Sequence, residues 1–372
     1  MTGPGNEDGG QRHRDWRRRE VLELLGAMGL ASLGAGCGGG GNSETPEIRD
    51  VPTDDVAPIV APPPPLPGPF PEFEPAPGDL PMVSLVRRPT VAESVRTAVE
   101  MIGGMGFIAA GERVLIKPNV NSGLPYPATT NPEVVAEVAR LALAAGAGEV
   151  IVGDRSHFAD DSMKNLQDSG IAAAALAAGA RVVDLETDGW TVVTPMEAIS
   201  WPSGFAVSTL GLAVDHVISL PVVKTHVASV FTLSMKNQVG MLRPDDRLSG
   251  LHSGGGDQKN ARIAEINLAI APSLIVLDAT RAFVSGGPNT GLVRDVGMVI
   301  ASGDRVSCDV TGLALLKSLG TRAEIAYRHV FDQSVIVRAI SLNLGITGPE
   351  GYTALAEGVP ELDTLLGYIA RS

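Results

Sequence analysis

The stretch NPEVVAEVARLALAAGAGEVIVGD, residues 131–154, contains the unit that decides the fold. Asn131 and Pro132 are a typical N-cap and first-turn pair for a helix, and a mainly apolar run then continues to Gly146. Residues 149–152 follow as a short β-rich run, which is typical of a buried strand. A helix followed at once by a strand is half of a β-α-β unit, in which a helix joins two parallel strands.

The same alternation extends to both sides of this unit. Residues 82–86 are predicted to form a strand, and Thr90 then caps a helix with Glu93 completing a capping box. Further strands are expected at 113–116, 181–185, 214–220, 273–277 and 296–300, and helices at 171–178, 262–270 and 305–319. The pattern predicts an α/β fold with a mostly parallel sheet, flanking helices and Rossmann-like layering. Residues 190–212 indicate additional strands whose partners the sequence does not identify.

Residues 1–36 are typical of an export signal rather than of a folded element. Residues 12–19 are basic and residues 21–35 are modestly apolar, which is the order of segments in a secretory signal. The apolar run is shorter than the roughly 20 residues that a membrane-spanning helix needs. Arg18 and Arg19, followed by one residue and two apolar ones, resemble the twin-arginine export signal.

Cys37 ends this segment at a position where lipid attachment is expected. Residues 33–37 resemble the lipobox of bacterial lipoproteins, whose cysteine is lipidated, and simple cleavage without lipid is the alternative. Residues 37–81 are rich in Gly and Pro and predict a disordered tether to a folded domain at 82–372. We therefore expect an exported, extracytoplasmic protein that uses the twin-arginine machinery and is anchored to the bacterial cell envelope through Cys37.

Composition excludes several classes of function. The net charge of −13 disfavours nucleic acid as a partner, because nucleic-acid binding needs a basic surface. The chain has two cysteines, so it can hold neither a disulfide framework nor an iron–sulfur cluster. No zinc motif is present. Asp154, His157, Asp160 and Asp161 form an oxygen-rich group, so a hard divalent cation stays an alternative ligand. The sequence identifies no other cofactor.

Polar residues follow four of the expected strands. Lys117 and Asn119 follow residues 113–116, Asp154 follows 149–152, Lys224 and His226 follow 214–220, and Asp278 follows 273–277. Ligands of open α/β sheets collect at the carboxyl ends of strands, so we expect these side chains to share one cleft. The mostly apolar segment 222–242 also contains Lys236 and Asn237.

The residue types in this group suggest an acid–base site for an anion. Buried ammonium groups need a carboxylate or a ligand, and Asp154, Asp278 and Asp309 are the expected carboxylates. The predicted catalytic residues are Lys224, His226 and Lys236, and the predicted substrate-binding residues are Lys117, Asn119, Asp154, Asn237, Asp278, Gly286 and Gly287. The backbone amides of Gly286–Gly291 could hold an anion or form a plain turn. An internal ion-pair network without a ligand is the structural alternative.

At these residues the chain resembles the family known as domain of unknown function 362. The matching segments are residues 114–119, 146–154, 224–240, Asp278 with the GGPNTG loop, and residues 303–309. The resemblance implies the fold and the place of the site, but no reaction, because the activity of the family is not established. Members often carry a ferredoxin-like cysteine cluster, and this chain differs from them because its two cysteines are too few for one.

Three functions are compatible with this sequence. The first is an enzyme that acts on a small anionic molecule outside the cytoplasm, with its reaction and substrate left open. The second is a tethered, non-catalytic protein that binds an anion or a metal through the same residues. The third is a structural or partner-docking lipoprotein.

Overall fold

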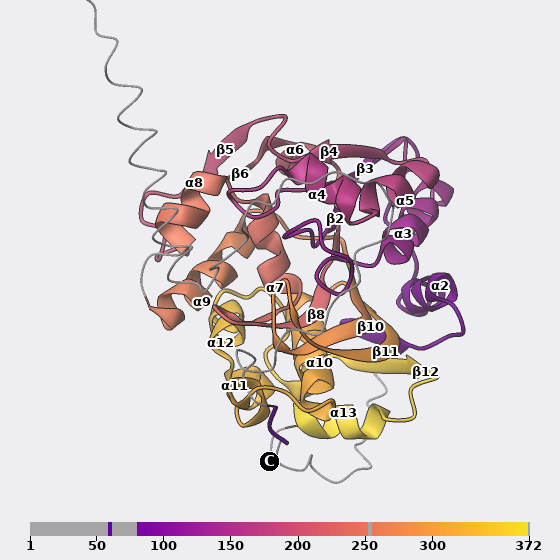
Figure 1. Ribbon diagram of the computed structural model, residues 1–372, viewed down its shortest axis with the longest axis vertical. Helices are drawn as coiled ribbons and strands as arrows, with labels where there is room; N and C mark the ends of the chain where they lie inside the picture. The colour runs from indigo at the N-terminus through magenta and orange to yellow at the C-terminus, as the bar shows by residue number, and fades with distance from the viewer. Residues whose placement is uncertain (1–58, 62–79, 252–254, 371–372) are drawn as a thin grey trace, which may run out of the picture. The chain divides into compact units, whose positions relative to one another are not determined.

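A ten-stranded sheet forms the centre of the computed structural model, which describes residues 59–61, 80–251 and 255–370. Its strands are β1 (Met82–Val86), β2 (Arg113–Pro118), β3 (Glu149–Asp154), β4 (Arg181–Asp184), β7 (His216–Leu220), β8 (Val222–His226), β9 (Val230–Thr232), β10 (Leu274–Gly286), β11 (Gly291–Ser302) and β12 (Thr353–Glu357). The main path runs β12-β1-β11-β10-β7-β2-β3-β4, and β8 pairs with β10 and β9 (Figure 1).

Most pairings along this path are parallel, which confirms the predicted fold class. The pairs β12–β1, β10–β7, β7–β2, β2–β3 and β3–β4 are parallel. The pairs β1–β11 and β11–β10 are antiparallel. The parallel block β7-β2-β3-β4 brings the carboxyl ends of its strands to one edge of the sheet, and the polar residues of the expected site begin there.

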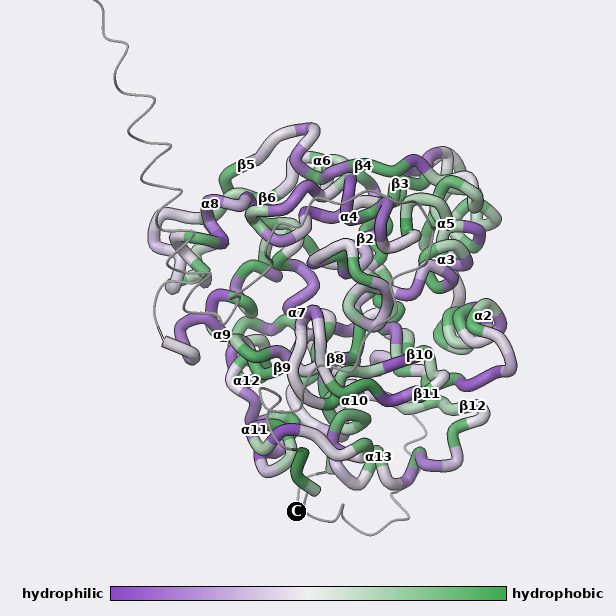
Figure 2. Tube along the Cα trace, in the orientation of Figure 1, coloured by the Kyte–Doolittle hydropathy of each residue, from purple (hydrophilic) through white to green (hydrophobic). Residues whose placement is uncertain are grey.

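Helices cover both faces of the sheet (Figure 1). The helices are α2 (Val91–Met101), α3 (Pro132–Ala144), α4 (Ser162–Asp168), α5 (Ile171–Ala177), α6 (Thr209–Ala213), α7 (Ser234–Asn237), α8 (Pro244–Asp246), α9 (Gly256–Glu265), α10 (Arg305–Ser318), α11 (Ala323–Ala326), α12 (Ser334–Ser341) and α13 (Leu362–Ile369). Side chains alternate along a strand, so Leu115 of β2 packs into one core and Val114 and Ile116 into the other. Helices α2, α3 and α5 line the second core, and α9, α10, α12 and α13 line the first. Figure 2 shows green, apolar stretches in α2 and α10.

The local signals that the sequence offered determine several of these elements. Thr90 caps α2 with the predicted capping box, in which its hydroxyl accepts from the Glu93 amide and the Glu93 carboxylate accepts from the Thr90 amide. The Asn131 side chain accepts from the Glu133 amide at the start of α3, and Pro132 occupies the first turn. Both helices therefore begin where capping chemistry predicts.

The structure also differs from the predictions in three places. The strands expected at 273–277 and 296–300 are the ends of the longer β10 and β11, which form an antiparallel hairpin. The extra strands expected within 190–212 are β5 (Trp190–Val193) and β6 (Phe205–Ser208), which pair with each other outside the main sheet. The elements β8, β9 and β12 were not predicted, because their sequences alternate too briefly or contain charges.

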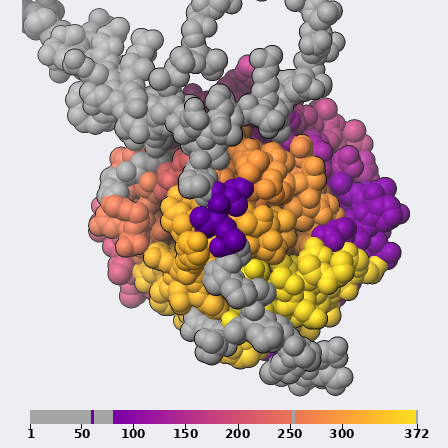
Figure 3. Space-filling model, turned by 60° about the horizontal axis from the view of Figure 1, so that its bottom comes forward, coloured from indigo at the N-terminus to yellow at the C-terminus, as the bar shows by residue number. Residues whose placement is uncertain are grey.

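Three residues of the expected tether, 59–61, lie against the domain. Val60 forms an isolated β-bridge with Thr321, and Ile59 packs against the first core. Figure 3 shows these residues in indigo over the orange and yellow C-terminal segments. The predicted signal residues Arg18 and Arg19 and the predicted lipidation site Cys37 lie outside the described residues. Among the helices that are described, none is both long and apolar enough to cross a bilayer.

Candidate functional site

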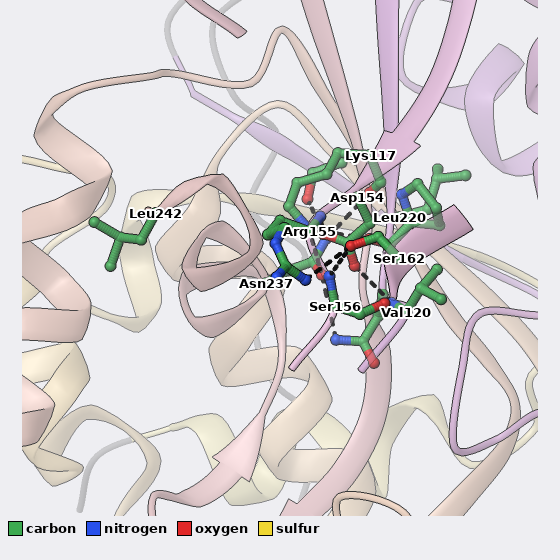
Figure 4. A network of polar contacts seen from close by, with 12 residues as sticks. Lys117, Val120, Asp154, Arg155, Ser156, Ser162, Leu220, Asn237 and Leu242 are labelled. Carbon is green, nitrogen blue, oxygen red and sulfur yellow. Dashed lines mark hydrogen bonds and ion pairs between the residues drawn. The ribbon is translucent and has the colours of Figure 1, made fainter. Parts of the chain in front are cut away.

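A buried ion pair joins the ends of the neighbouring parallel strands β2 and β3. Lys117 Nζ donates to Asp154 Oδ1 over 2.7 Å, to the Pro118 carbonyl over 3.0 Å and to Asn237 Oδ1 over 3.4 Å. Asp154 Oδ2 also accepts from the Val120 amide over 2.7 Å (Figure 4). Burial lowers the pKa of Lys117, and the Asp154 carboxylate opposes that shift. The pair is therefore a closed contact in which the carboxylate compensates the ammonium.

Lys224 of β8 is buried without a carboxylate. Its Nζ donates to Asn119 Oδ1 over 2.7 Å, to the Ala128 carbonyl over 2.6 Å and to the Pro288 carbonyl over 3.2 Å. Burial lowers the pKa of Lys224 well below its ordinary value. Three oxygen acceptors nevertheless require three N–H donors, which only the ammonium form provides. We therefore assign Lys224 as a charged residue that holds together the loops containing Ala128 and Pro288.

Asn237 connects the two lysines. Its Oδ1 accepts from Asn119 Nδ2 over 3.3 Å, while its Nδ2 donates to the Lys117 carbonyl over 3.2 Å and to Ser219 Oγ over 3.0 Å. Lys117, Asn119, Asp154, Lys224 and Asn237 thus form one hydrogen-bonded set, here called the bonded network. The structure brings together these five predicted residues from elements far apart in the sequence.

Gly240 lies directly against the bonded network. A Cβ added at this position would overlap the Asp154 carboxylate and the Lys117 ammonium. Glycine at 240 therefore permits the close approach of the segment that carries Lys236 and Asn237 to the ion pair.

Asp309 of α10 holds the short helix α7. Its carboxylate accepts from the Ser234 amide over 2.6 Å and from the Met235 amide over 3.2 Å. Burial raises the pKa of Asp309 to about 7. The sequence predicted Asp309 as a lysine partner, but its contacts fix the helix on which Lys236 and Asn237 lie.

Lys236 differs from the other two lysines. The described residues supply no hydrogen-bond acceptor or carboxylate for its Nζ, and its side chain is half-buried. Burial lowers the pKa of Lys236 to about 7, and the positive charges of Lys259 and Arg247 contribute to that shift. Near neutral pH this lysine therefore exists in both its charged and its neutral form.

Arg247 is a buried cation that the sequence did not predict as a site residue. It begins a π-helical turn, Arg247–Leu251, and donates from Nε to the Leu242 carbonyl and from Nη1 to the Ser156 carbonyl. Its Nη2 has no partner among the described residues, and neither has Ser156 Oγ. Asp245 and Asp246 precede it in the sequence, and no residue pattern marks Arg247 as buried. Lys236, Arg247 and Ser156 are here called the unpartnered group.

Three predicted residues form their hydrogen bonds outside the bonded network. Asp278 accepts from the Asn131 amide over 2.7 Å and from Thr280, so it fixes the start of α3. His226 Nδ1 accepts from the Ala228 amide over 3.0 Å at the end of β8. The Gly287 amide donates to the Thr290 carbonyl over 2.6 Å in the β10–β11 turn. Gly286 and Gly287 thus shape a turn whose Pro288 carbonyl binds Lys224, and the Gly287 amide is already engaged.

The predicted convergence is present, but its side chains fill the space between the strand ends. Lys117 and Lys224 are 0% exposed, and Asp154 and Asn237 are 3% and 2% exposed. A cavity of about 450 Å³ lies elsewhere, between β9, α9, α11 and α12. None of the predicted site residues lines that cavity.

In the oxygen-rich group that suggested a cation, His157 and Asp160 face each other over 3.8 Å, and Asp154 and Asp161 are bound elsewhere. Asp154 binds Lys117, Asp161 caps α4 through the Lys164 amide, and Asp160 accepts from Asn165. Within the described part of the chain, no three His, Cys, Asp or Glu side chains are grouped to hold a metal ion.

Comparisons with known proteins give the following matches. Residues 114–314 match the model of a family described as domain of unknown function (DUF362). A curated relative named thylakoid-associated protein, from Synechocystis sp., is 32% identical over 222 residues, which cover 58% of this chain and 67% of the relative.

Two solved structures are similar at lower levels. One is a Thermotoga maritima protein, with 11% identity, a TM-score of 0.32, and coverage of 51% of this chain and 50% of that protein. The other is the lactate racemase apoprotein from Thermoanaerobacterium thermosaccharolyticum, with 11% identity, a TM-score of 0.34, and coverage of 56% and 54%. The chain spans about half the length of each of these two proteins.

Proposed function

The chain belongs to the DUF362 family, a domain of unknown function, and on that premise we propose that its folded domain is an enzyme acting on a small anionic substrate. The proposal assigns proton transfer to Lys236 and attraction of the anion to the positive charges around it. One observation carries the proposal: no described residue supplies a hydrogen-bond acceptor for Lys236.

The difference between the lysines determines their roles. Lys117 and Lys224 each meet three oxygen acceptors, so neither can release a proton without losing a buried hydrogen bond. Lys236 has no such bond to lose, and its pKa of about 7 is close to the value at which an acid–base group works best near neutral pH. Lys236 is the catalytic lysine of this proposal, and Lys117 and Lys224 are positioning residues.

The charge balance supports an anionic substrate. No ion pair between Lys224, Lys236 or Arg247 and a carboxylate is found among the described residues, whereas Lys117 has Asp154. A buried cation without a counter-charge destabilises the protein by several kcal/mol, because water no longer solvates it. A bound anion supplies that counter-charge, and the excess positive charge attracts it.

The remaining predicted residues support this arrangement. His226 Nδ1 accepts a backbone hydrogen bond from the Ala228 amide at the end of β8. His226 stays in the proposal as an acid–base residue because of its residue type. Asn119, Asp154, Asn237 and Asp278 hold the strand ends and α7 and α3 in place, and Gly286 and Gly287 shape the turn at Pro288.

A non-catalytic anion-binding protein is the second candidate. The closed hydrogen bonding of Lys117, Lys224 and Asn237 favours it, because these groups provide rigidity and no proton transfer. Both candidates use the same positive charges, so they differ only in whether a product is formed.

We also propose that the protein is exported through the twin-arginine machinery and anchored by lipid at Cys37. Arg18, Arg19 and the segment around Cys37 support this proposal, and the relative's name associates that protein with the thylakoid. Fractionation of cells that express the full chain tests it. The wild type is expected in the membrane fraction, Cys37→Ala in the soluble extracytoplasmic fraction, and the doubly substituted Arg18→Lys, Arg19→Lys chain in the cytoplasm. Wild-type protein that is not exported would contradict the proposal.

The enzymatic proposal is tested by thermal unfolding of the full-length protein against phosphates, carboxylates and sulfate, followed by product analysis for each compound that stabilises it. Lys236→Met is expected to lose turnover while remaining folded. Lys164→Met, which removes an exposed lysine paired with Asp168, is the matched control and is expected to retain it. Stabilisation of the wild type without any product favours the binding protein. Turnover that survives Lys236→Met would remove Lys236 from the mechanism.

A further inference from the structure

Arg247 and Ser156, which are hydrogen-bonded to each other, each hold an unused hydrogen-bond donor. Arg247 is 5% exposed and Ser156 is 1% exposed. Arg247 Nη1 donates to the Ser156 carbonyl over 2.6 Å, which holds the guanidinium against the Ser156 backbone. Arg247 Nη2 and Ser156 Oγ have no partner among the described residues. An unpaired buried donor costs about 1–3 kcal/mol, so such a pair indicates a missing acceptor.

The guanidinium also lacks a counter-charge. Asp154, Asp184 and Glu186 attract it and Arg155 repels it, but none of the three carboxylates forms an ion pair with Arg247 in the described structure. Asp154 is bonded to Lys117, and Glu186 is paired with Arg155 over 3.0 Å. Two of the three nearby carboxylates are thus paired with other cations, and Asp184 accepts from the Glu186 amide. A guanidinium stays charged at neutral pH, so its charge remains uncompensated until an anion binds.

We propose that Arg247 Nη2 and Ser156 Oγ form a subsite for the oxyanion group of the substrate, either a phosphate or a carboxylate. This proposal rests on the proposed function. It identifies the part of the substrate that binds at the positive charges. An N–H and an O–H donor on two residues in contact can serve two oxygens of one oxyanion, and a charged donor makes such a bond about twice as strong as a neutral one. The subsite adjoins the bonded network, because Ser156 follows Asp154 and Arg155 at the end of β3 (Figure 4).

Isothermal titration of the full-length protein with inorganic phosphate and, separately, with acetate tests the subsite. The comparison shows whether the subsite binds a phosphate or a carboxylate. One of the two probes is expected to bind the wild type. Arg247→Met and Ser156→Ala are each expected to weaken that binding about tenfold or more, the loss typical of a hydrogen bond to a charged group. Arg281→Met removes an arginine that is already paired with Asp295, and is expected to change binding less than about twofold.

Ser156→Ala keeps the test decisive if Arg247→Met does not fold. Its hydroxyl is unpartnered, so its removal is expected to leave the ligand-free melting temperature unchanged or slightly raised while binding weakens. Binding that is the same in wild type, Arg247→Met and Ser156→Ala would overturn the subsite. If Lys236→Met abolishes turnover in that case, the proposed function survives and only the subsite is wrong. Failure of both probes to bind the wild type would also overturn the subsite.

Discussion

In the bonded network each lysine meets three oxygen acceptors, whereas in the unpartnered group Lys236 and Arg247 retain donors that no described residue accepts. Both regions lie at the same end of the central strands and both contain buried or half-buried cations. The difference separates two uses of a buried positive charge. A cation whose N–H groups all have acceptors holds loops together, whereas a cation with a free N–H group can bind a ligand.

The strongest test of the bonded network changes Gly240. Gly240→Ala places a methyl group where the Asp154 carboxylate and the Lys117 ammonium meet, so it should separate the ion pair. We expect a loss of about 3–5 kcal/mol in the free energy of unfolding, the cost typical of breaking a buried pair. Denaturant unfolding measures it. Gly106→Ala is the control, because its added Cβ meets no atom within 4 Å. Equal stability of both variants would contradict the close approach.

The second test compares the two kinds of lysine. Lys224→Met leaves Asn119 Oδ1 and two carbonyl oxygens without a donor, so we expect a loss of about 2–4 kcal/mol in the free energy of unfolding. Lys236→Met removes no hydrogen bond to another described residue and should change the free energy of unfolding by less than about 1 kcal/mol. Denaturant unfolding of the two variants side by side gives the contrast. Equal losses would show that the two lysines do not differ in their bonding.

Asp309 links the bonded network to the unpartnered group through α7. Asp309→Ala removes the acceptor of the Ser234 and Met235 amides, and a lost cap costs about 1–2 kcal/mol. We expect this loss together with weaker anion binding, because α7 carries both Asn237 and Lys236. Asp363→Ala in the exposed first turn of α13 is the control for unfolding and for binding. Anion binding that is unaffected by Asp309→Ala would show that α7 is not part of the site.

The sequence could predict the parts of this comparison that depend on local chemistry. The caps at Thr90 and Asn131 and the short apolar strands β2 and β3 have clear signatures, so the parallel half of the sheet and the meeting of Lys117 with Asp154 followed from them. The hairpin of β10 and β11 has no such signature. Local periodicity does not predict which residues of its two strands pair with each other.

The partners of most site residues could not be predicted, because many of them are backbone groups. Lys224 binds the carbonyls of Ala128 and Pro288, and Asp278 binds the amide of Asn131, and no residue type marks such groups in a sequence. Arg247 was missed for a different reason, since its segment, residues 244–251, contains no motif that indicates a site. Residue types therefore indicated where the polar groups gather, but not which of them are already bonded.

The smallest expected effect is a pH dependence of anion binding. Lys236 is an ammonium below its pKa of about 7 and a neutral amine above it, so its attraction for an anion is present at lower pH and is lost as the pH rises through 7. Titration with sulfate, whose charge stays constant from about pH 6 to about pH 8, should show affinity falling several-fold over that range. Lys236→Met should bind sulfate with a flat profile. An equally steep profile in Lys236→Met would assign the titration to another group.

The ionisation of Lys236 can be observed directly by an NMR titration of the lysine side-chain amines, with Lys236→Met used to assign its signal. We expect a midpoint near pH 7 in the ligand-free protein and a higher midpoint when an anion is bound, because the anion stabilises the ammonium. A midpoint near the ordinary value of 10.5, unchanged by any anion that stabilises the protein, would contradict it.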